Sequence, residues 1–470
     1  MPLVRKWVAF AFVALVVVGL GVYFGASHVL ESDAARARIE QQLSARLGQP
    51  VRIGSVRVAL FPDIAVDLRD VTIGAPEALK LGRVKVLTGL RALFADVVDI
   101  REVAVFDGRP AGSNPGFTFD LNASVLGDRL NVASLTARGA TTRIDGKGTL
   151  TSIANLEGAF EMTSELLDLN ELFVIAAALA PPDRSGSGRP AAPRTSPMHF
   201  VVQTTAPRVR FGAYEFRDLS TTIDAVPSRF MLEGLSLNLF GGTFKGRLDA
   251  DTHGVSPVLR LTGKIANVDV DDLLKRTGSA GGITGRLAGQ VSLVASGADG
   301  AVLLRTAKGT IAAVVSNGSM PRLDLVRTLV LAFGKPSGTA AEGSGTAFDR
   351  LSGTFALAAG TLRSEDLLLR SRDFDTSGRG SLALETGAVS ARADVVLSPE
   401  LTAQAGTDLR RYAQEDGRVI VPATVGGTLA KPTVFIDVAA ATRRAFGNEL
   451  KRRATDFLGG LFKKKKGGGG

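Results

Sequence analysis

The most extensive pattern in this chain is an alternation of apolar and polar residues with a period of two. In residues 51–74, apolar side chains take every second position of several short runs, such as Val51 with Ile53 and Val71 with Ile73. This period places one row of side chains on each face of a β-strand. Similar runs recur at intervals of roughly eight to twelve residues as far as Val438, separated by turn-forming residues. The chain is therefore predicted to be mainly β, as an extended antiparallel sheet, a sandwich or a barrel.

One stretch departs from this alternation, because residues 7–27 are apolar on every face and carry no charge. At about 1.5 Å per residue, they would form roughly 31 Å of helix, the thickness of a bilayer's hydrocarbon core. Arg5 and Lys6 precede the stretch, and positive flanks stay in the cytoplasm. We expect a transmembrane anchor at 7–27, a cytoplasmic tip at 1–6, and the bulk of the chain on the far side of the membrane.

The larger side chains of this anchor are Trp7, Phe10, Phe12, Leu15, Val18, Leu20, Tyr23 and Phe24. A cleaved signal peptide, which usually has a shorter apolar core, and a buried core helix are the alternatives.

Short helices are expected between the strands. Three alternating runs end in Asp or Asn, at residues 167–172, 268–274 and 322–326, and an acidic side chain there can cap a helix that follows. The second run contains three carboxylates and could also be a calcium loop. Such a loop requires Gly at its sixth position and Glu at its twelfth, where this chain has Leu274 and Ala280, so capping is favoured.

The pattern divides the chain into two β-rich regions. Residues 181–197 are rich in Pro, Gly and Ser and are predicted to be a flexible loop or linker. It would separate an N-terminal β-rich region at 28–180 from a C-terminal β-rich region at 198–440. Residues 441–470 form a basic tail.

The charge of the chain is concentrated in that tail. The net charge is +10, and the nine Lys and Arg of residues 441–470 against Glu449 and Asp456 supply +7 of it, which leaves +3 elsewhere. A near-neutral body argues against nucleic-acid binding. The tail could form an amphipathic helix on an anionic membrane surface, or pack on the last strands and continue as a solvated end. Its candidate membrane-surface residues are Phe446, Leu450, Phe457, Leu461, Lys463, Lys464, Lys465 and Lys466.

No sequence motif indicates catalysis, a metal or a cofactor. The chain has no Cys, which excludes disulfides and Cys-ligated metals, and its three His residues are far apart in sequence. The phosphate-loop and nucleophile-elbow signatures are absent. Glu365 and Asp366 are adjacent on a predicted strand and should therefore point to opposite faces. We expect a protein that is not an enzyme and binds no cofactor, although carboxylates from distant strands could still form a glycosidase-like pair.

The order of elements after the anchor resembles the start of the AsmA family of envelope proteins. A short helix ends in residues 47–51 (LGQPV), and a strand with Ile53-Gly54, a turn at residues 60–62 (LFP) and a strand through residues 68–74 (LRDVTIG) follow. Residues 425–432 (VGGTLAKP) are similar to the closing motif of that family. The resemblance implies an inner-membrane anchor, a periplasmic body, and a role in outer-membrane biogenesis.

Larger relatives of the AsmA family look like bridges that carry phospholipid along a hydrophobic β-groove. The resemblance therefore implies that this chain binds or conveys phospholipid in a curled sheet, and aliphatic walls would suit acyl chains. The groove candidates on the first strands after the anchor are Val56, Val58, Leu60, Ile64, Val66 and Leu68, which could also be plain core residues. Expected partners are the inner membrane, a phospholipid ligand, and envelope or outer-membrane assembly proteins. A scaffold or adaptor for outer-membrane protein assembly is the alternative.

Overall fold

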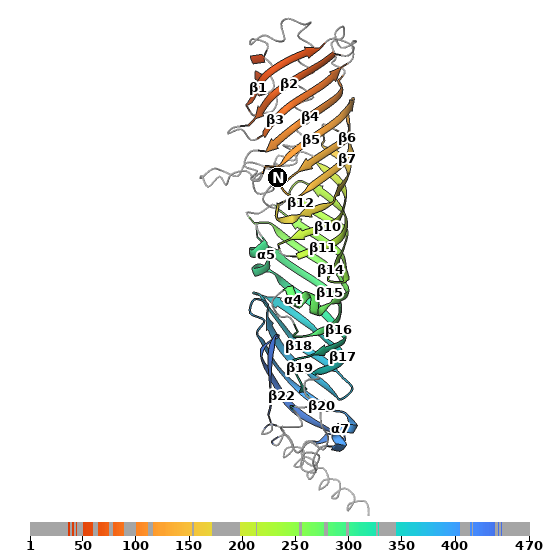
Figure 1. Ribbon diagram of the computed structural model, residues 1–470, viewed down its shortest axis with the longest axis vertical. Helices are drawn as coiled ribbons and strands as arrows, with labels where there is room; N and C mark the ends of the chain where they lie inside the picture. Colours follow the sequence, from red (N-terminus) through yellow and green to blue (C-terminus); the bar gives the residue numbers. More distant parts are fainter. Residues whose placement is uncertain are drawn as a thin grey trace, which may run out of the picture. The chain divides into compact units, whose positions relative to one another are not determined.

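In a computed structural model, the residues that can be described form mainly β-strands (Figure 1). The structure describes residues 36–37, 40–41, 44, 50–59, 64–74, 79–88, 100–110, 116–152, 155–171, 198–212, 214–252, 256–276, 281–297, 300–325, 328, 345–404, 414–415, 417–437, 440 and 443. They fall into two compact units, one within residues 1–238 and 245–259, the other within residues 239–244 and 260–470. The predicted anchor at 7–27, the linker at 181–197 and the tail residues of interest lie outside the described residues and stay predictions.

The first unit is a curved sheet in which strands pair in chain order. Its strands are β1 (Val51–Ala59), β2 (Ile64–Ile73), β3 (Leu79–Thr88), β4 (Ile100–Pro110), β5 (Thr118–Leu126), β6 (Arg129–Arg138), β7 (Arg143–Ser152), β8 (Glu157–Ser164), β9 (Leu166–Asp168), β10 (His199–Phe211), β11 (Tyr214–Val226) and β12 (Arg229–Leu239). Consecutive strands from β1 to β8 and from β10 to β12 are antiparallel.

The pairing of β10 with β8 and β9 is parallel, so the prediction of an antiparallel sheet is wrong at this position. Both β8 and β9 pair with β10 in parallel register, for example Val202 opposite Phe160. Parallel neighbours need a long crossover between them, and about thirty residues separate β9 from β10. The sequence shows the length of this connection but not the direction in which it returns.

The second unit is also a curved sheet. β13 (Gly242–Asp251) and β14 (Val258–Asp269) contribute residues to both units. The remaining elements are α4 (Val270–Arg276), β15 (Thr284–Ser296), α5 (Gly300–Thr306), β16 (Lys308–Met320), β17 (Thr346–Ala358), β18 (Thr361–Arg370), β19 (Phe374–Ala383), β20 (Val389–Leu397), α7 (Pro399–Gln404), β21 (Gln414–Glu415), β22 (Arg418–Thr428) and β23 (Lys431–Ile436). Antiparallel pairing runs from β15 through β20 and then to β22 and β23. The mainly β, curved sheet with short helices is confirmed.

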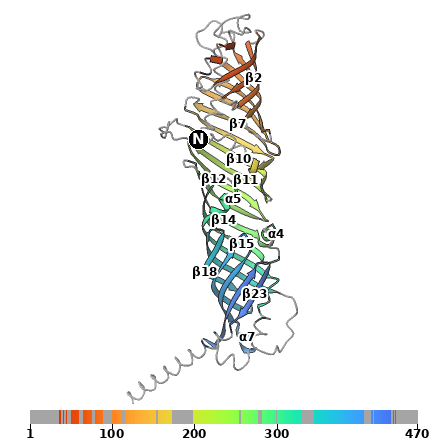
Figure 2. The same cartoon turned by 90° about the vertical axis from the view of Figure 1, so that its left-hand side faces the viewer.

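This sheet curls until its last hairpin meets its beginning, without closing into a barrel. Arg322, in the turn after β16, donates a hydrogen bond from Nη1 to the carbonyl oxygen of Ala430 at 2.6 Å. A Cβ added to Gly282, just before β15, would lie 2.5 Å from the carbonyl oxygen of Leu429. No strand pairing joins β15 to β23 in the part of the chain that the structure describes. Figure 2 shows β23 and β18 on this curled part of the sheet.

Several strands contain a residue with a left-handed backbone. Asp70, Asp107, Asn267 and Asn317 have positive φ values in mid-strand, at 52°, 53°, 57° and 50°. Three of them lie against a glycine of the preceding strand: Asp70 against Gly54, Asp107 against Gly82 and Asn267 against Gly242. Asp and Asn tolerate the left-handed region better than most residues. The strand register also shifts at Asp107 and Asn317, and a β-bulge of this kind increases the local twist.

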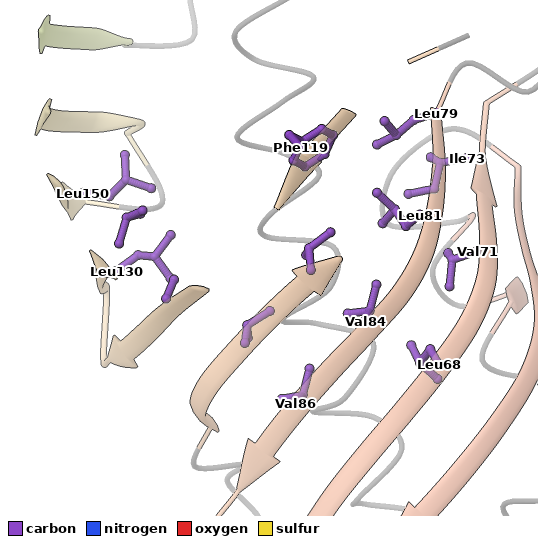
Figure 3. Packing of buried hydrophobic residues seen from close by; sticks show 14 of the residues in the cluster. Leu68, Val71, Ile73, Leu79, Leu81, Val84, Val86, Phe119, Leu130 and Leu150 are labelled. Carbon is purple, nitrogen blue, oxygen red and sulfur yellow. The ribbon is translucent and has the colours of Figure 1, made fainter. Parts of the chain in front are cut away.

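The core of the first unit lies where its strands curve around their apolar rows. The central side chains of β2 and β3 are at most 3% exposed: Leu68, Val71, Ile73, Leu79, Leu81, Val84 and Val86. In Figure 3, Leu130 and Leu150 from β6 and β7 lie across from Val84 and Leu81 on the inward side of the strands. The alternation in the sequence thus becomes one buried row per strand, as predicted.

Helical residues at positions 36–37, 40–41 and 44 cover the free edge of β1. The backbone N–H of Ile53 donates to Glu40 Oε1 at 2.6 Å, and that of Val51 donates to Ser44 Oγ at 2.9 Å. Unpaired edge groups invite other strands, and these side chains satisfy two of them. The short helix expected after the anchor therefore packs against the sheet edge.

Within the described part of the chain, no helix combines the length and the apolar character that a membrane crossing requires.

Candidate functional site

The apolar rows of the second unit share one face of its sheet, which we call the inner face. The strand register places Val291 opposite Ile311, and Ile311 opposite Phe355. The adjacent row continues from Leu357 to Leu362 and onward across the sheet. We call these seven residues the inner stripe: Val291, Ile311, Phe355, Leu357, Leu362, Leu382 and Val389.

The inner stripe is incompletely covered. Val291 and Leu357 are 8% and 6% exposed, whereas the other five side chains are half-buried. No member belongs to a buried hydrophobic cluster of the described residues. Contact with water leaves part of the favourable free energy of apolar burial unrealised, at about 25 cal/mol per Å². A contiguous, partly exposed apolar surface of this kind is typical of binding sites.

The other end of the same strands is covered by helices and turns. Val270 of α4 and Leu323 and Leu325 after β16 pack with Phe374 and Val395 in one cluster. Leu401 of α7 adds to it. The inner face of the second unit therefore has a packed end and a partly open end.

The opposite face of these strands is polar. Arg286, Gln290 and Ser292 of β15 alternate with the apolar row and are exposed, as are Lys308 and Thr310 of β16. These strands are thus amphipathic, with their apolar rows on the inner face.

The groove candidates chosen from the sequence lie in the first unit and are tightly packed where their side chains are described. Val66 and Leu68 are 2% and 1% exposed inside the core, and Val56 packs against it. Val58 and Ile64 lie in the paired strands β1 and β2, and Leu60 lies outside the described residues. The sequence left open whether these residues line a lipid groove or form the core. Val66 and Leu68 have the contacts of core residues.

The acidic runs act as helix caps. Asp269 Oδ1 accepts hydrogen bonds from the backbone N–H groups of Asp271 at 3.0 Å and Asp272 at 3.2 Å, at the start of α4. Asp168 Oδ1 does the same for Asn170 and Glu171. No group of three or more potential metal ligands occurs within the described ranges. Capping is therefore confirmed at both positions.

Glu171 holds the turn between β6 and β7. Its carboxylate accepts hydrogen bonds from the backbone N–H groups of Ala140, Thr141 and Thr142 and from the hydroxyl of Thr141. Burial would raise the pKa of Glu171, but these hydrogen bonds outweigh it and lower the pKa below its ordinary value. The residue is fully engaged in fixing a turn, so it is poorly suited to act as a general base.

Other polar groups also have structural roles. A bulge between Ser364 and Leu367 leaves both Glu365 and Asp366 exposed, and both line the same surface hollow, so the prediction that they point to opposite faces is wrong. Asp366 accepts hydrogen bonds from Thr354 N at 2.7 Å and Ser364 Oγ at 2.8 Å, which lower its pKa. These contacts replace strand hydrogen bonds that the bulge interrupts.

Comparison with known proteins places this architecture in a family. Residues 130–367 match the model of the AsmA family, and these 238 residues are just over half of the 470. The chain belongs to the AsmA family. A comparison with curated proteins gives no match, and one with solved structures gives none either.

The AsmA match covers the middle of the chain, whereas the motifs that suggested the family from sequence lie at its two ends. The matched range contains β7 to β17 and five of the seven residues of the inner stripe. Sequence reasoning did not single out this stripe. The signal that could have found it is the presence of Gly and Ala in the apolar rows, such as Gly289, Ala313 and Gly353, which reduces the volume that fills the inner face.

Proposed function

We propose that this AsmA-family chain binds phospholipid on the inner face of its curled sheet and conveys it toward the outer membrane. The observation that carries the proposal is the inner stripe, a contiguous row of aliphatic and aromatic side chains, five of them half-buried, on the face opposite the exposed polar residues of the same strands. Acyl chains bind such a surface by area and without directional bonds, which would let a lipid slide. Membership of the AsmA family supports the same function.

The expected setting follows from the sequence. The apolar stretch at 7–27 would anchor the chain in the inner membrane, with the N-terminus in the cytoplasm and the bulk in the periplasm. The partners are then the inner membrane and, at the other end of the path, envelope or outer-membrane assembly proteins. The basic tail would add contact with an anionic lipid surface.

Native mass spectrometry with lipid extraction, on the full chain purified in mild detergent, tests the proposal. Wild-type protein should carry phospholipid. Ile311→Asp places a charge on the inner stripe and should lower the bound lipid about tenfold or more, because a carboxylate disfavours contact with acyl chains. Ala312→Asp is the matched control, since it adds the same charge to the exposed face of the same strand.

A folded wild-type protein that carries no lipid would contradict the carrier function. Equal lipid loss in Ile311→Asp and Ala312→Asp would also contradict the inner stripe as the binding surface. Either result would favour a scaffold for outer-membrane protein assembly.

A further inference from the structure

Two hydroxyl groups lie without a partner on the inner face of the first unit. Four buried hydroxyls have no hydrogen-bond partner in the described structure: those of Ser164, Thr204, Thr252 and Thr376. The first two lie on neighbouring strands, Ser164 on β8 and Thr204 on β10. Ser164 is 5% exposed. The pair is therefore polar, enclosed and unsatisfied.

The strand register brings this pair together. Thr204 lies opposite Met162, and Ser164 follows Met162 by two residues, on the same face of β8. On the far side, β7 places Gly146 opposite Met162 and Ile144 opposite Ser164. Thr204 and Ser164 are thus one strand and two residues apart on an otherwise largely apolar surface.

The side chains around this pair are less completely buried than those of β2 and β3. A Cβ added to Gly146 would make ordinary contacts, at 3.4 Å from the carbonyl oxygen of Glu161 and 3.5 Å from Cγ of Met162. Ile144, Met162 and Thr204 are half-buried, unlike the inward side chains of β2 and β3. The inner face of the first unit is consequently less tightly packed around Met162 and Thr204 than at β2 and β3, although Phe200 and Ala206, which flank Thr204 on β10, are 4% and 1% exposed.

The two hydroxyls have no evident structural purpose. Thr221, directly opposite Thr204 on β11, donates to the carbonyl oxygen of Glu233 at 3.1 Å and is satisfied. A buried hydroxyl without a partner lowers stability, and Ala or Val would avoid that loss at the same volume. A bound group that accepts hydrogen bonds would account for both residues.

We propose that Ser164 Oγ and Thr204 Oγ1 donate hydrogen bonds to the two ester carbonyl oxygens of a diacyl lipid. This inference rests on the proposed lipid-binding function. The carbonyls of a diacyl glycerolipid are near each other, between the chains and the headgroup, and they are acceptors only. The hydroxyl pair makes the site selective for ester-linked lipids over ether-linked ones.

Competition between two lipids tests this selectivity. Native mass spectrometry of the full chain would compare dioleoyl phosphatidylethanolamine with its diether analogue, which has matching chains and headgroup but no ester carbonyls. Wild-type protein should prefer the diester roughly 5- to 150-fold, the range that two hydrogen bonds supply. The double variant Ser164→Ala with Thr204→Val should lose this preference and bind the diether as wild type does.

Two further variants secure the interpretation. Thr205→Val changes an exposed residue next to Thr204 and should keep the preference, and Thr204→Ser should keep most of it because the hydroxyl remains. Equal binding of both lipids by wild type, or an unchanged preference in the double variant, would overturn the selectivity while leaving the proposed function standing. Failure to bind either lipid would overturn both. A double variant that gains thermal stability without a change in preference would show that the hydroxyls are tolerated defects.

Discussion

The two units build the same amphipathic strands but fill their inward faces differently. In β2 and β3 of the first unit, the inward row consists of Val, Leu and Ile, each at most 3% exposed. In β15 to β17 of the second unit, Gly289, Ala313 and Gly353 lie directly opposite one another in the inward row. Small side chains leave volume that their neighbours do not fill, so the flanking inner stripe stays half-buried.

This difference teaches that alternation and volume carry separate information. Alternation decides which face of a strand is apolar, and both units obey it. The size of the apolar residues decides whether that face becomes a dry core or a surface that another molecule could cover.

The largest expected effect is a difference in stability between the two apolar rows. Leu68→Ala removes a fully buried side chain and should cost about 3 kcal/mol of the free energy of opening in the first unit. Leu362→Ala, on the inner stripe, should cost about 1 kcal/mol in the second unit, because part of its surface already contacts water. Hydrogen exchange resolved by peptide measures each unit separately. Equal losses would mean that the inner stripe is as well packed as the core, and the comparison would fail.

A smaller effect concerns the stability of the first unit at acid pH. The lowered pKa of Glu171 means that its stabilising contribution is complete above its unfolded pKa and is lost as the pH falls through the folded pKa. Glu171→Gln should cost about 1 to 2 kcal/mol at pH 7 through the weakened hydrogen bonds to residues 140–142, and this difference should shrink toward pH 3.

The control for Glu171 is a carboxylate of the same unit that is exposed. Glu161 pairs with Lys147 at 3.0 Å on the outer face, with both side chains more than half exposed. Glu161→Gln should change the stability by less than about 0.5 kcal/mol at any pH. A pH-independent loss in Glu171→Gln would show that shape, and not charge, holds the turn.

The sequence predicts local features of this fold well. Alternation locates strands such as Arg129–Arg138, and an acidic residue after a strand locates the cap of α4. These features depend on neighbours in the chain. The parallel pairing of β8 with β10 depends on strands that are distant in sequence, and the alternation carries no sign of it.

The candidate site shows the same limit. The first strands were chosen because they follow the anchor, but Val66 and Leu68 are packed in the core. Locating partly covered apolar surface requires knowing which small residues face one another across strands, as Gly289 and Ala313 do. That information comes from register, which a single sequence does not give.

The N-terminal cap of α4, the helix at the packed end of the second unit, provides a third test. Asp269→Ala removes the cap of α4 and should cost about 1 kcal/mol, because two backbone N–H groups lose their acceptor. Val270 and Leu274 of this helix contribute to the cluster under it. Hydrogen exchange in α4 should accelerate, and Asp269→Asn should restore most of the protection because Asn also caps helices. Unchanged exchange in Asp269→Ala would show that packing alone holds α4 in place.

The smallest expected effect compares two glycines of the first unit, Gly54, where an added Cβ would clash, and Gly146, where it would make ordinary contacts. A Cβ on Gly54 would lie 2.9 Å from the Cβ of Asp70, so Gly54→Ala should destabilise by roughly 1 kcal/mol through overpacking against Asp70. A Cβ on Gly146 would meet nothing closer than 3.4 Å, and Gly146→Ala should be neutral or stabilise by up to about 0.5 kcal/mol, because alanine restricts the unfolded chain. Thermal unfolding of both variants gives the signs. If Gly146→Ala destabilised as much as Gly54→Ala, the inner face at β7 would be as full as the edge at β1, and no lipid could lie beside Ser164 and Thr204.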